Sequence, residues 1–263
     1  MPFSPIQPEK VSTAVCRQIE MLILQGVLRP EERLPAERDL ATQLEVSRPT
    51  VREALADLES RGLITVRPGG GAFVAAILGN AFAPPLIELF ATQEVALFDY
   101  IEFRRDLEAV AAARAAERAT ETDRASIRSI FERMVNAHQR RNPAEESSID
   151  ADFHMAIVEA AHNVVMLHMA RSLYELLRRG VFYNRNVTYG EQESRDRLLE
   201  QHRAIHDAVI AADPDAARSA VEAHMDFVKA HLSTVSQLRS REEIARLRME
   251  QENRLIRAEP RRR

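Results

Sequence analysis

One stretch of the sequence, residues 35–75, constrains the fold of this chain more than any other. Its first part, PAERDLATQL at 35–44, predicts a helix with proline in the first turn. After a three-residue break, Ser47 is expected to cap a second helix, which ends at Gly62. Two short apolar runs then flank the turn sequence RPGGG and predict a β-hairpin. This order of elements indicates a winged helix-turn-helix.

The second of these helices has a polar face at its N-terminus. Arg48 and Arg52 are four residues apart and therefore share a face, while Ser47 and Thr50 lie on the same first turn. We expect two guanidinium groups and two hydroxyl groups to be free there. Arginine can bind the O6 and N7 atoms of guanine together, and hydroxyls and N-terminal amides suit phosphates. This face therefore predicts the reading of double-stranded DNA.

Two further positions fit a contact with DNA. Arg38 on the preceding helix could hold the phosphate backbone, and Gly69 lies in a hairpin tip that could approach a groove closely. For two arginines alone, a solvated pair of amphipathic helices would be the better interpretation. The complete order of capped helices and glycine hairpin favours DNA binding instead. Because one such helix is a small footprint, we expect a homodimer on a palindromic operator.

The composition limits the alternatives without announcing a nucleic-acid binder. The net charge is −4, and residues 1–75 hold nine Lys and Arg against ten Asp and Glu, so any basic surface depends on placement. Cys16 is the only cysteine, which excludes an intrachain disulfide or a thiolate metal cluster. No apolar run reaches the roughly 18 residues of a membrane span, and no signal-peptide pattern is present. We expect a cytoplasmic location and no contact with a membrane.

The fold class expected for the whole chain is mainly α. It combines an N-terminal winged helix-turn-helix with a C-terminal all-α, ligand-binding helical bundle. The expected divisions are the DNA-binding domain at 1–75, a linker at 76–94, the effector-binding domain at 95–235 and an Arg/Glu-rich tail at 236–263. Helices are predicted at about 95–119, 121–140, 144–162, 164–188, 193–212 and 214–236. The tail is expected to be a frayed helix or disordered.

Polar residues at helical spacing are the candidate site of the bundle. Asp150 and His154 are four residues apart on one predicted helix, and His202 and His224 belong to two others. One carboxylate and up to three imidazoles could meet inside the bundle and hold Zn²⁺ or another first-row divalent ion. Taken singly, each is more often a surface or core residue. His206, four residues after His202, could also compete for its place.

Two more residues are candidates for contact with a small effector. Arg104 would be a carboxylate clamp if it lay inside the bundle, since a guanidinium binds a carboxylate through two hydrogen bonds. Arg105, next in the chain, is the candidate for an ordinary surface arginine. Asn163 serves equally well as a helix terminus or as a polar contact to a ligand.

The stretch RLPAERDLATQLEVSRPTVREALADLESRGLITVRPGGGAFV resembles the N-terminal domain of the GntR superfamily. The helical remainder resembles the FadR subfamily, so that the likeness covers about residues 10–235. It implies that the operator is contacted by Arg38, Ser47, Arg48, Thr50, Arg52 and Gly69. Pro68 stands where one member of the family reads a base with a wing-tip histidine.

The same resemblance has implications for the bundle. Asp150, His154, His202 and His224 match an Asp–His–His–His metal site, and Arg104 with Glu108 match a family pair. Segments such as EAAHNVVMLHMAR and ADFHMAIVEA are similar to pyruvate- and lactate-responsive members. They imply a repressor of central carbon metabolism that senses a small monocarboxylate, pyruvate first. Lactate, glycolate or a sugar acid are the alternatives.

Two other classes of protein compete with a ligand-gated regulator. A metal-dependent hydrolase is disfavoured, because Arg203 follows the first histidine of His202–x–x–x–His206 where such an enzyme carries glutamate. An architectural DNA-binder without an effector is disfavoured by the polar cluster. The sequence therefore predicts a regulator and no enzyme.

Overall fold

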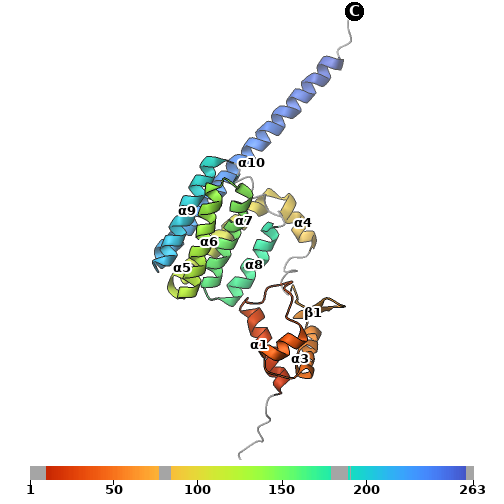
Figure 1. The fold of residues 1–263 in the computed structure, drawn as a ribbon. Coiled ribbons are helices and arrows are strands. Elements are labelled where there is room, and N and C mark those ends of the chain that lie inside the picture. The colour runs from red at the N-terminus through yellow and green to blue at the C-terminus, as the bar shows by residue number, and fades with distance from the viewer. Residues whose placement is uncertain (1–9, 77–83, 179–188, 190, 259–263) are drawn as a thin grey trace, which may run out of the picture. The chain divides into compact units, whose positions relative to one another are not determined.

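The computed structural model describes residues 10–76, 84–178, 189 and 191–258. The chain forms two compact units (Figure 1). The first holds Met1–Ile87 with Asn163–Glu175, and the second holds Glu88–His162 with Leu176–Arg263. The linker expected at 76–94 lies partly outside the described residues, and α4 (Pro84–Thr92) begins within it, longer than the expected LIELF helix.

The winged helix-turn-helix is confirmed in the first unit. Its elements are α1 (Val11–Leu24), α2 (Glu37–Gln43), α3 (Arg48–Ser60), β1 (Ile64–Arg67) and β2 (Gly71–Val74). The two strands pair antiparallel, with Ile64 opposite Val74 and Arg67 opposite Gly71. Helices and hairpin enclose one apolar core, which includes Val15, Ile19, Ile23, Leu40, Val51, Leu55, Leu58, Ile64 and Val74.

Glycine is required at the tip of the hairpin. Gly69 has φ +69° and Gly71 has φ +93°, a left-handed conformation that a residue with a Cβ adopts only with strain. A Cβ built at Gly69 would meet no atom within 4 Å. The tip is therefore both tightly turned and open, as an element that approaches a groove needs to be.

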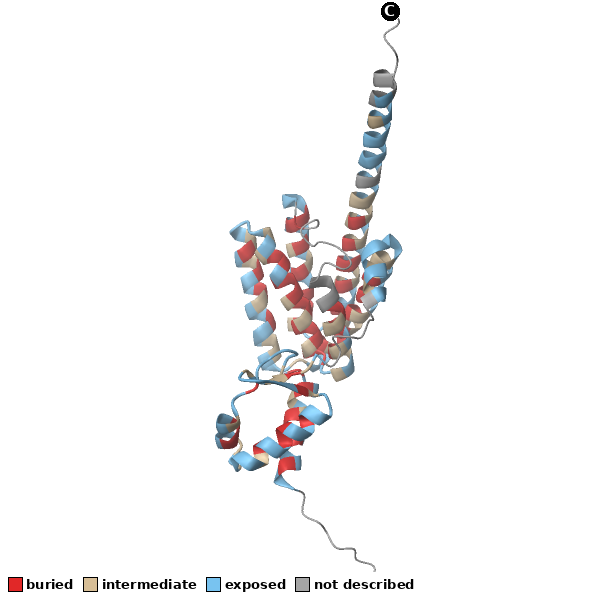
Figure 2. Ribbon diagram, turned by 90° about the vertical axis from the view of Figure 1, so that its right-hand side faces the viewer, coloured by how far each residue is buried: buried red, intermediate tan, exposed pale blue. Residues whose placement is uncertain are grey.

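The second unit is a bundle of long helices. They are α5 (Glu94–Arg118), α6 (Glu121–Gln139), α7 (Pro143–Ala160), α9 (Gln192–Ile210) and α10 (Pro214–Ala258). α5 packs against α7, α9 and α10, while α6 packs against α7 and α9. The buried residues of these helices face one another (Figure 2). Six alanines of α5 are buried, which lets neighbouring helices approach closely: Ala109, Ala111, Ala112, Ala113, Ala115 and Ala116.

α10 departs from expectation, because it continues as helix through Ala258. Of the two alternatives expected for the tail, a frayed helix or disorder, the structure has helix for residues 236–258, and disorder is wrong there. Short-range ion pairs along the helix support it, such as Arg246 with Glu243 at 2.8 Å. α10 is long, but neither it nor any other described helix is apolar enough to cross a bilayer.

α8 (Val164–Arg178) begins immediately after Asn163. The Asn163 side-chain oxygen accepts a hydrogen bond from the Met166 backbone N–H at 3.0 Å. The structure thus gives Asn163 the role of a helix cap. The helix was predicted to reach residue 188, but residues 179–188 lie outside the described part of the chain.

Candidate functional site

The N-terminus of α3 carries the polar face predicted for DNA. Ser47 caps the helix, since its Oγ accepts from the Thr50 backbone N–H at 3.3 Å. The same Oγ lies 2.7 Å from Thr50 Oγ1, so each hydroxyl already has a partner. The expectation of two free hydroxyls is therefore wrong in detail, because the cap uses them. Each hydroxyl can still form a second hydrogen bond, since it carries one donor and two acceptor sites.

The two arginines of this face differ in their surroundings. The side chain of Arg52 donates to Glu37 on α2, with Nη2 2.9 Å from Oε2, although it stays 67% exposed. The expectation of two free guanidinium groups is therefore wrong for Arg52. The hydrogen bond from Arg52 lowers the pKa of Glu37, which keeps the carboxylate charged. Arg48 is exposed and has no hydrogen bond among the described residues. Arg38 is also exposed and pairs with its neighbour Asp39 at 3.4 Å.

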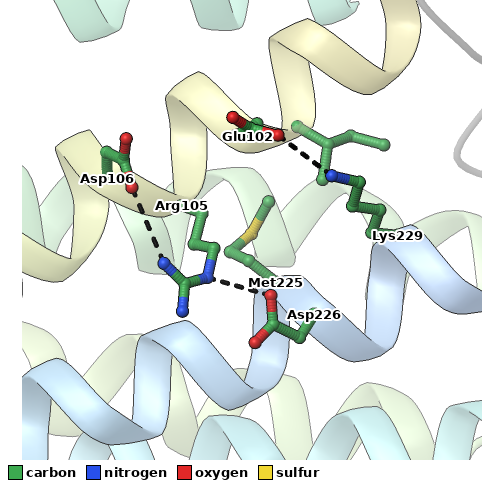
Figure 3. Close-up of a pocket in the computed structure, with 7 residues that line it drawn as sticks. Glu102, Arg105, Asp106, Met225, Asp226 and Lys229 are labelled. Carbon is green, nitrogen blue, oxygen red and sulfur yellow. Dashed lines mark hydrogen bonds and ion pairs between the residues drawn. The ribbon is translucent and has the colours of Figure 1, made fainter.

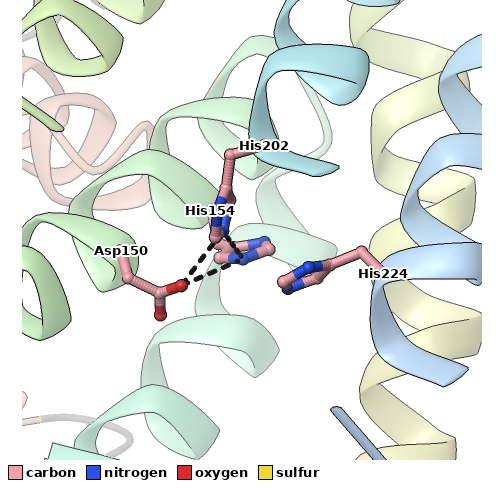
Figure 4. A group of neighbouring side chains, drawn as sticks. All are labelled: Asp150, His154, His202 and His224. Atoms are coloured by element: carbon pink, nitrogen blue, oxygen red, sulfur yellow. Dashed lines mark hydrogen bonds and ion pairs between the residues drawn. The ribbon is translucent and has the colours of Figure 1, made fainter. Parts of the chain in front are cut away.

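The four candidate metal ligands come together inside the bundle (Figure 4). α7 supplies Asp150 and His154 one turn apart, α9 supplies His202, and α10 supplies His224. One ligand atom of each lies within 4.8 Å of those of the others, and all four residues are buried. His202 Nε2 is 3.2 Å from His154 Nε2 and 3.0 Å from Asp150 Oδ1.

The imidazoles are held from outside the cluster through their Nδ1 atoms. The partners are Glu108 Oε2 at 2.8 Å from His154, the Leu198 carbonyl at 2.7 Å from His202 and Gln201 Oε1 at 3.0 Å from His224. A carbonyl or carboxylate only accepts, so the proton of each ring lies on Nδ1. The Nε2 lone pairs are therefore directed into the cluster.

Burial keeps two of these rings neutral. It lowers the pKa of His202, although the Asp150 carboxylate acts in the opposite direction. Burial also lowers the pKa of His224 well below its usual value, and the neighbouring His202 and His154 add to the effect. Neutral imidazoles and a carboxylate present electron pairs to one point. This is the donor set that a divalent cation requires.

The spacing of the ligand atoms also fits a metal. In a tetrahedral zinc site with bonds of about 2.0–2.1 Å, ligand atoms lie roughly 3.3 Å apart. Here His154 Nε2 is 3.2 Å from His202 Nε2 and 3.7 Å from Asp150 Oδ1. The Asp150 carboxylate is also held by Tyr189, whose hydroxyl donates a hydrogen bond to Asp150 Oδ1 at 3.1 Å. These residues therefore fit an ion such as Zn²⁺.

Arg104 lies next to this cluster and is buried, as a carboxylate clamp would require. Its Nε donates to Glu108 Oε1 at 2.6 Å, while the other oxygen of Glu108 contacts His154. Burial alone would raise the pKa of Glu108, but the charge of Arg104 and the hydrogen bonds from His154 and Arg104 outweigh it and lower that pKa far below its usual range. One carboxylate thus connects the candidate clamp to a candidate metal ligand.

The residues considered as competitors lie elsewhere. His206 stacks on Phe131 with ring centroids 4.6 Å apart and does not join the cluster. Arg105 lines a surface depression between α5 and α10, where it pairs with Asp226 at 2.9 Å (Figure 3). In the same depression Lys229 pairs with Glu102 at 3.0 Å. The charges that line this depression are thus paired within the protein. The depression therefore has less positive charge available to bind an anion than the buried cluster has.

Sequence reasoning did not find three of the contributors to the cluster that the described residues show. They are Tyr189, Gln201 and the Leu198 carbonyl. Gln201 precedes His202 in the chain, but adjacency alone does not signal a role on another helix. The Leu198 carbonyl has a local signal, because it lies one turn before His202 on the same helix.

Comparison with known proteins identifies both units. Residues 11–74 match the family described as bacterial regulatory proteins, gntR family, and residues 99–227 match the FCD domain. Among solved structures, a GntR protein of Streptococcus agalactiae covers 84% of this chain and 99% of its own, with a TM-score of 0.51. At 23% identity this similarity shows the fold alone.

Curated relatives span nearly the full length. The "Putative L-lactate dehydrogenase operon regulatory protein" of Escherichia coli K12 is 38% identical, over 85% of this chain and 86% of that protein. The Glc operon transcriptional activator of the same organism is 33% identical, over 86% and 90%. The HTH-type transcriptional regulator LutR of Bacillus subtilis is 30% identical, over 81% and 96%. These proteins are transcriptional regulators and not enzymes, and the present chain belongs with them to the GntR family, as a DNA-binding regulator with an FCD domain.

Proposed function

We propose that this regulator senses a small 2-hydroxy or 2-keto monocarboxylate through a divalent metal such as Zn²⁺, held by Asp150, His154, His202 and His224. The observation that carries the proposal is the convergence of three imidazoles and a carboxylate beside a buried arginine. A protein that only bends DNA has no need of such a cluster. The charge of Asp150 and the three polar rings around it would cost stability in a buried site unless a ligand compensated them.

The chemistry of the pocket indicates a carboxylate. Zinc can expand from four to five ligands, as it does at catalytic sites, so a metal held by these residues could add an oxygen ligand. A 2-hydroxy or 2-keto acid offers two oxygens at chelating distance. Arg104 would receive the carboxylate, since a guanidinium binds it through two parallel hydrogen bonds. Because Glu108 contacts both Arg104 and His154, a ligand that bound Arg104 would also affect the hydrogen bond between Glu108 and His154.

The relatives bear on the choice of acid. One carries L-lactate dehydrogenase in its name, which moves L-lactate ahead of pyruvate as the first compound to test. Pyruvate and glycolate remain in the series, because all three share the carboxylate and a neighbouring oxygen. We further propose that the protein acts in the cytoplasm as a homodimeric repressor on a palindromic operator, since twofold symmetry doubles the small footprint of α3.

The experiment is a titration of the zinc-loaded protein–operator complex with L-lactate, pyruvate, glycolate and a long-chain acyl thioester. We expect one of the three small acids to change operator affinity, with no turnover of the acid. Arg104→Lys should weaken that response and Arg104→Ala should weaken it more. Lysine keeps the positive charge but loses the pair of parallel hydrogen bonds that a guanidinium gives to a carboxylate. Arg105→Ala is the matched control and should respond normally. A response to the thioester alone would contradict the proposed ligand class.

A further inference from the structure

Gln201 occupies a special place in the packing of α9 against α10. It is half-buried, and its Oε1 accepts a hydrogen bond from Nδ1 of His224 on α10 at 3.0 Å. The next residue, His202, is turned by about 100° around the helix and points into the cluster. α9 therefore provides one candidate ligand directly and holds another that belongs to its neighbour.

Of the acceptors on the other two rings, one differs in charge from this amide and one is a neutral carbonyl like it. Glu108 gives His154 a full carboxylate, and Leu198 gives His202 a backbone carbonyl. An acceptor on Nδ1 fixes the tautomer and the orientation of a ligating imidazole and raises its basicity, and a carboxylate does so more strongly than an amide. The ring of His224 is thus oriented like the others but polarised less than that of His154.

We infer that Gln201 is a positioning residue of the metal centre. It holds the proton of His224 on Nδ1, directs Nε2 toward Asp150, and keeps the metal affinity below the value that a charged acceptor would give. This inference rests on the proposed metal site. A moderate affinity suits a sensor whose metal must accept and release an effector. If this hydrogen bond only joined α9 to α10, its loss would lower the stability of the fold. The metal affinity would then not increase with the charge of the acceptor at position 201.

The test uses the full-length protein with Gln201→Glu and Gln201→Leu. Zinc affinity is measured by competition with a chromophoric chelator. We expect Gln201→Leu to weaken zinc binding about 10- to 100-fold, as loss of such a partner does elsewhere. Gln201→Glu should bind zinc more tightly than the wild type. Gln192→Leu is the matched control, because Gln192 donates to the exposed Asp196 on the same helix at 2.6 Å and should leave zinc affinity unchanged.

A second readout does not depend on metal. Nitrogen chemical shifts of the imidazoles, measured on the metal-free protein, report which ring nitrogen carries the proton. We expect His224 to be protonated on Nδ1 in the wild type and to lose this preference in Gln201→Leu. Thermal unfolding of the metal-free variants shows whether the fold is kept.

The outcomes separate the two proposals. If the wild type binds no zinc, the metal centre itself is refuted, and the tautomer of His224 still decides whether Gln201 positions this ring. If zinc binds but both Gln201 variants match the Gln192 control, or glutamate weakens binding as leucine does, the role of Gln201 is refuted. An unchanged tautomer in Gln201→Leu would refute it as well.

Discussion

The DNA-reading face of α3 and the metal-ligand cluster of the bundle are built in opposite ways. The first places Ser47, Arg48, Thr50 and Arg52 within six consecutive residues, on or near the surface. The second takes four buried ligands from three helices between residues 150 and 224. A surface site of this kind needs only helical periodicity and a cap. A buried site also needs several helices to pack in one register, so its residues are at once ligands and core.

This difference predicts how each site fails. Changes on the face of α3 should alter DNA affinity and leave the fold unaffected. Changes in the cluster should alter ligand binding and stability together, because an unpaired polar group remains in the core. The following predictions test this contrast.

The largest effect is expected from the double change His154→Ala and His202→Ala. It should abolish metal binding and the effector response while operator binding by the first unit persists, since that unit has its own core. In the wild type, free zinc at 1,000 times its Kd should stabilise the protein by about 4 kcal/mol, and the double variant should lose this gain. Metal analysis and thermal unfolding measure both. His206→Ala is the control and should retain metal, and full occupancy in the double variant would contradict the assignment.

Next in size are Arg48→Ala and Arg52→Ala on the surface site. Each should weaken operator binding roughly 5- to 150-fold, because each guanidinium can hold a base edge. The unfolding midpoint should stay unchanged. Binding is measured on operator and random DNA at fixed salt, with Arg246→Ala of α10 as the control. Equal losses on both DNAs would make these arginines phosphate contacts.

The buried thiol of Cys16 allows the core of the DNA-binding unit to be examined through the pH dependence of its stability. Burial, with help from nearby Asp57, raises the pKa of its thiol to about 11. Well below pH 9, which is the usual pKa of the thiol, it is neutral in both the folded and the unfolded chain. As pH rises from 9 to 11 it ionises first in the unfolded chain, so stability on the order of 2 kcal/mol is lost. Urea unfolding across this range should show a steeper decline for the wild type than for Cys16→Ala. Parallel curves would show that the thiol contributes nothing.

The smallest effect is expected from Glu37→Gln. This change removes a negative charge near the phosphates and releases Arg52 from its ion pair. Affinity for DNA of any sequence should rise roughly two- to fivefold, in the range of exposed ion pairs, and discrimination between operator and random DNA should decrease. Glu53→Gln, on α3 outside the arginine pair, is the control. A gain on operator alone would instead assign Glu37 a role in base selection.

Much of the fold could be predicted because its signals are local. The Ser47 cap, the glycine tip and the helix starts at Pro143 and Pro214 depend on neighbours within a turn, and the structure has each of them. The tail was predicted less well. Its polar composition suggested a frayed helix or disorder, whereas ion pairs along the helix and continuity with the buried part of α10 support a helix through Ala258.

The sequence shows which residue types could bind a metal and how they are spaced along a helix. Asp150 and His154 could therefore be identified as a pair. Spacing could not choose between His202 and His206, since both lie on α9 four residues apart. Packing decides, because the turn of α9 that carries His202 faces α7 and α10, while His206 stacks on Phe131 of α6. The hydrogen bonds that the histidines donate to Glu108 and Gln201 are likewise tertiary. A helix determines from its own sequence which residues share a face, but only its neighbours determine what that face meets.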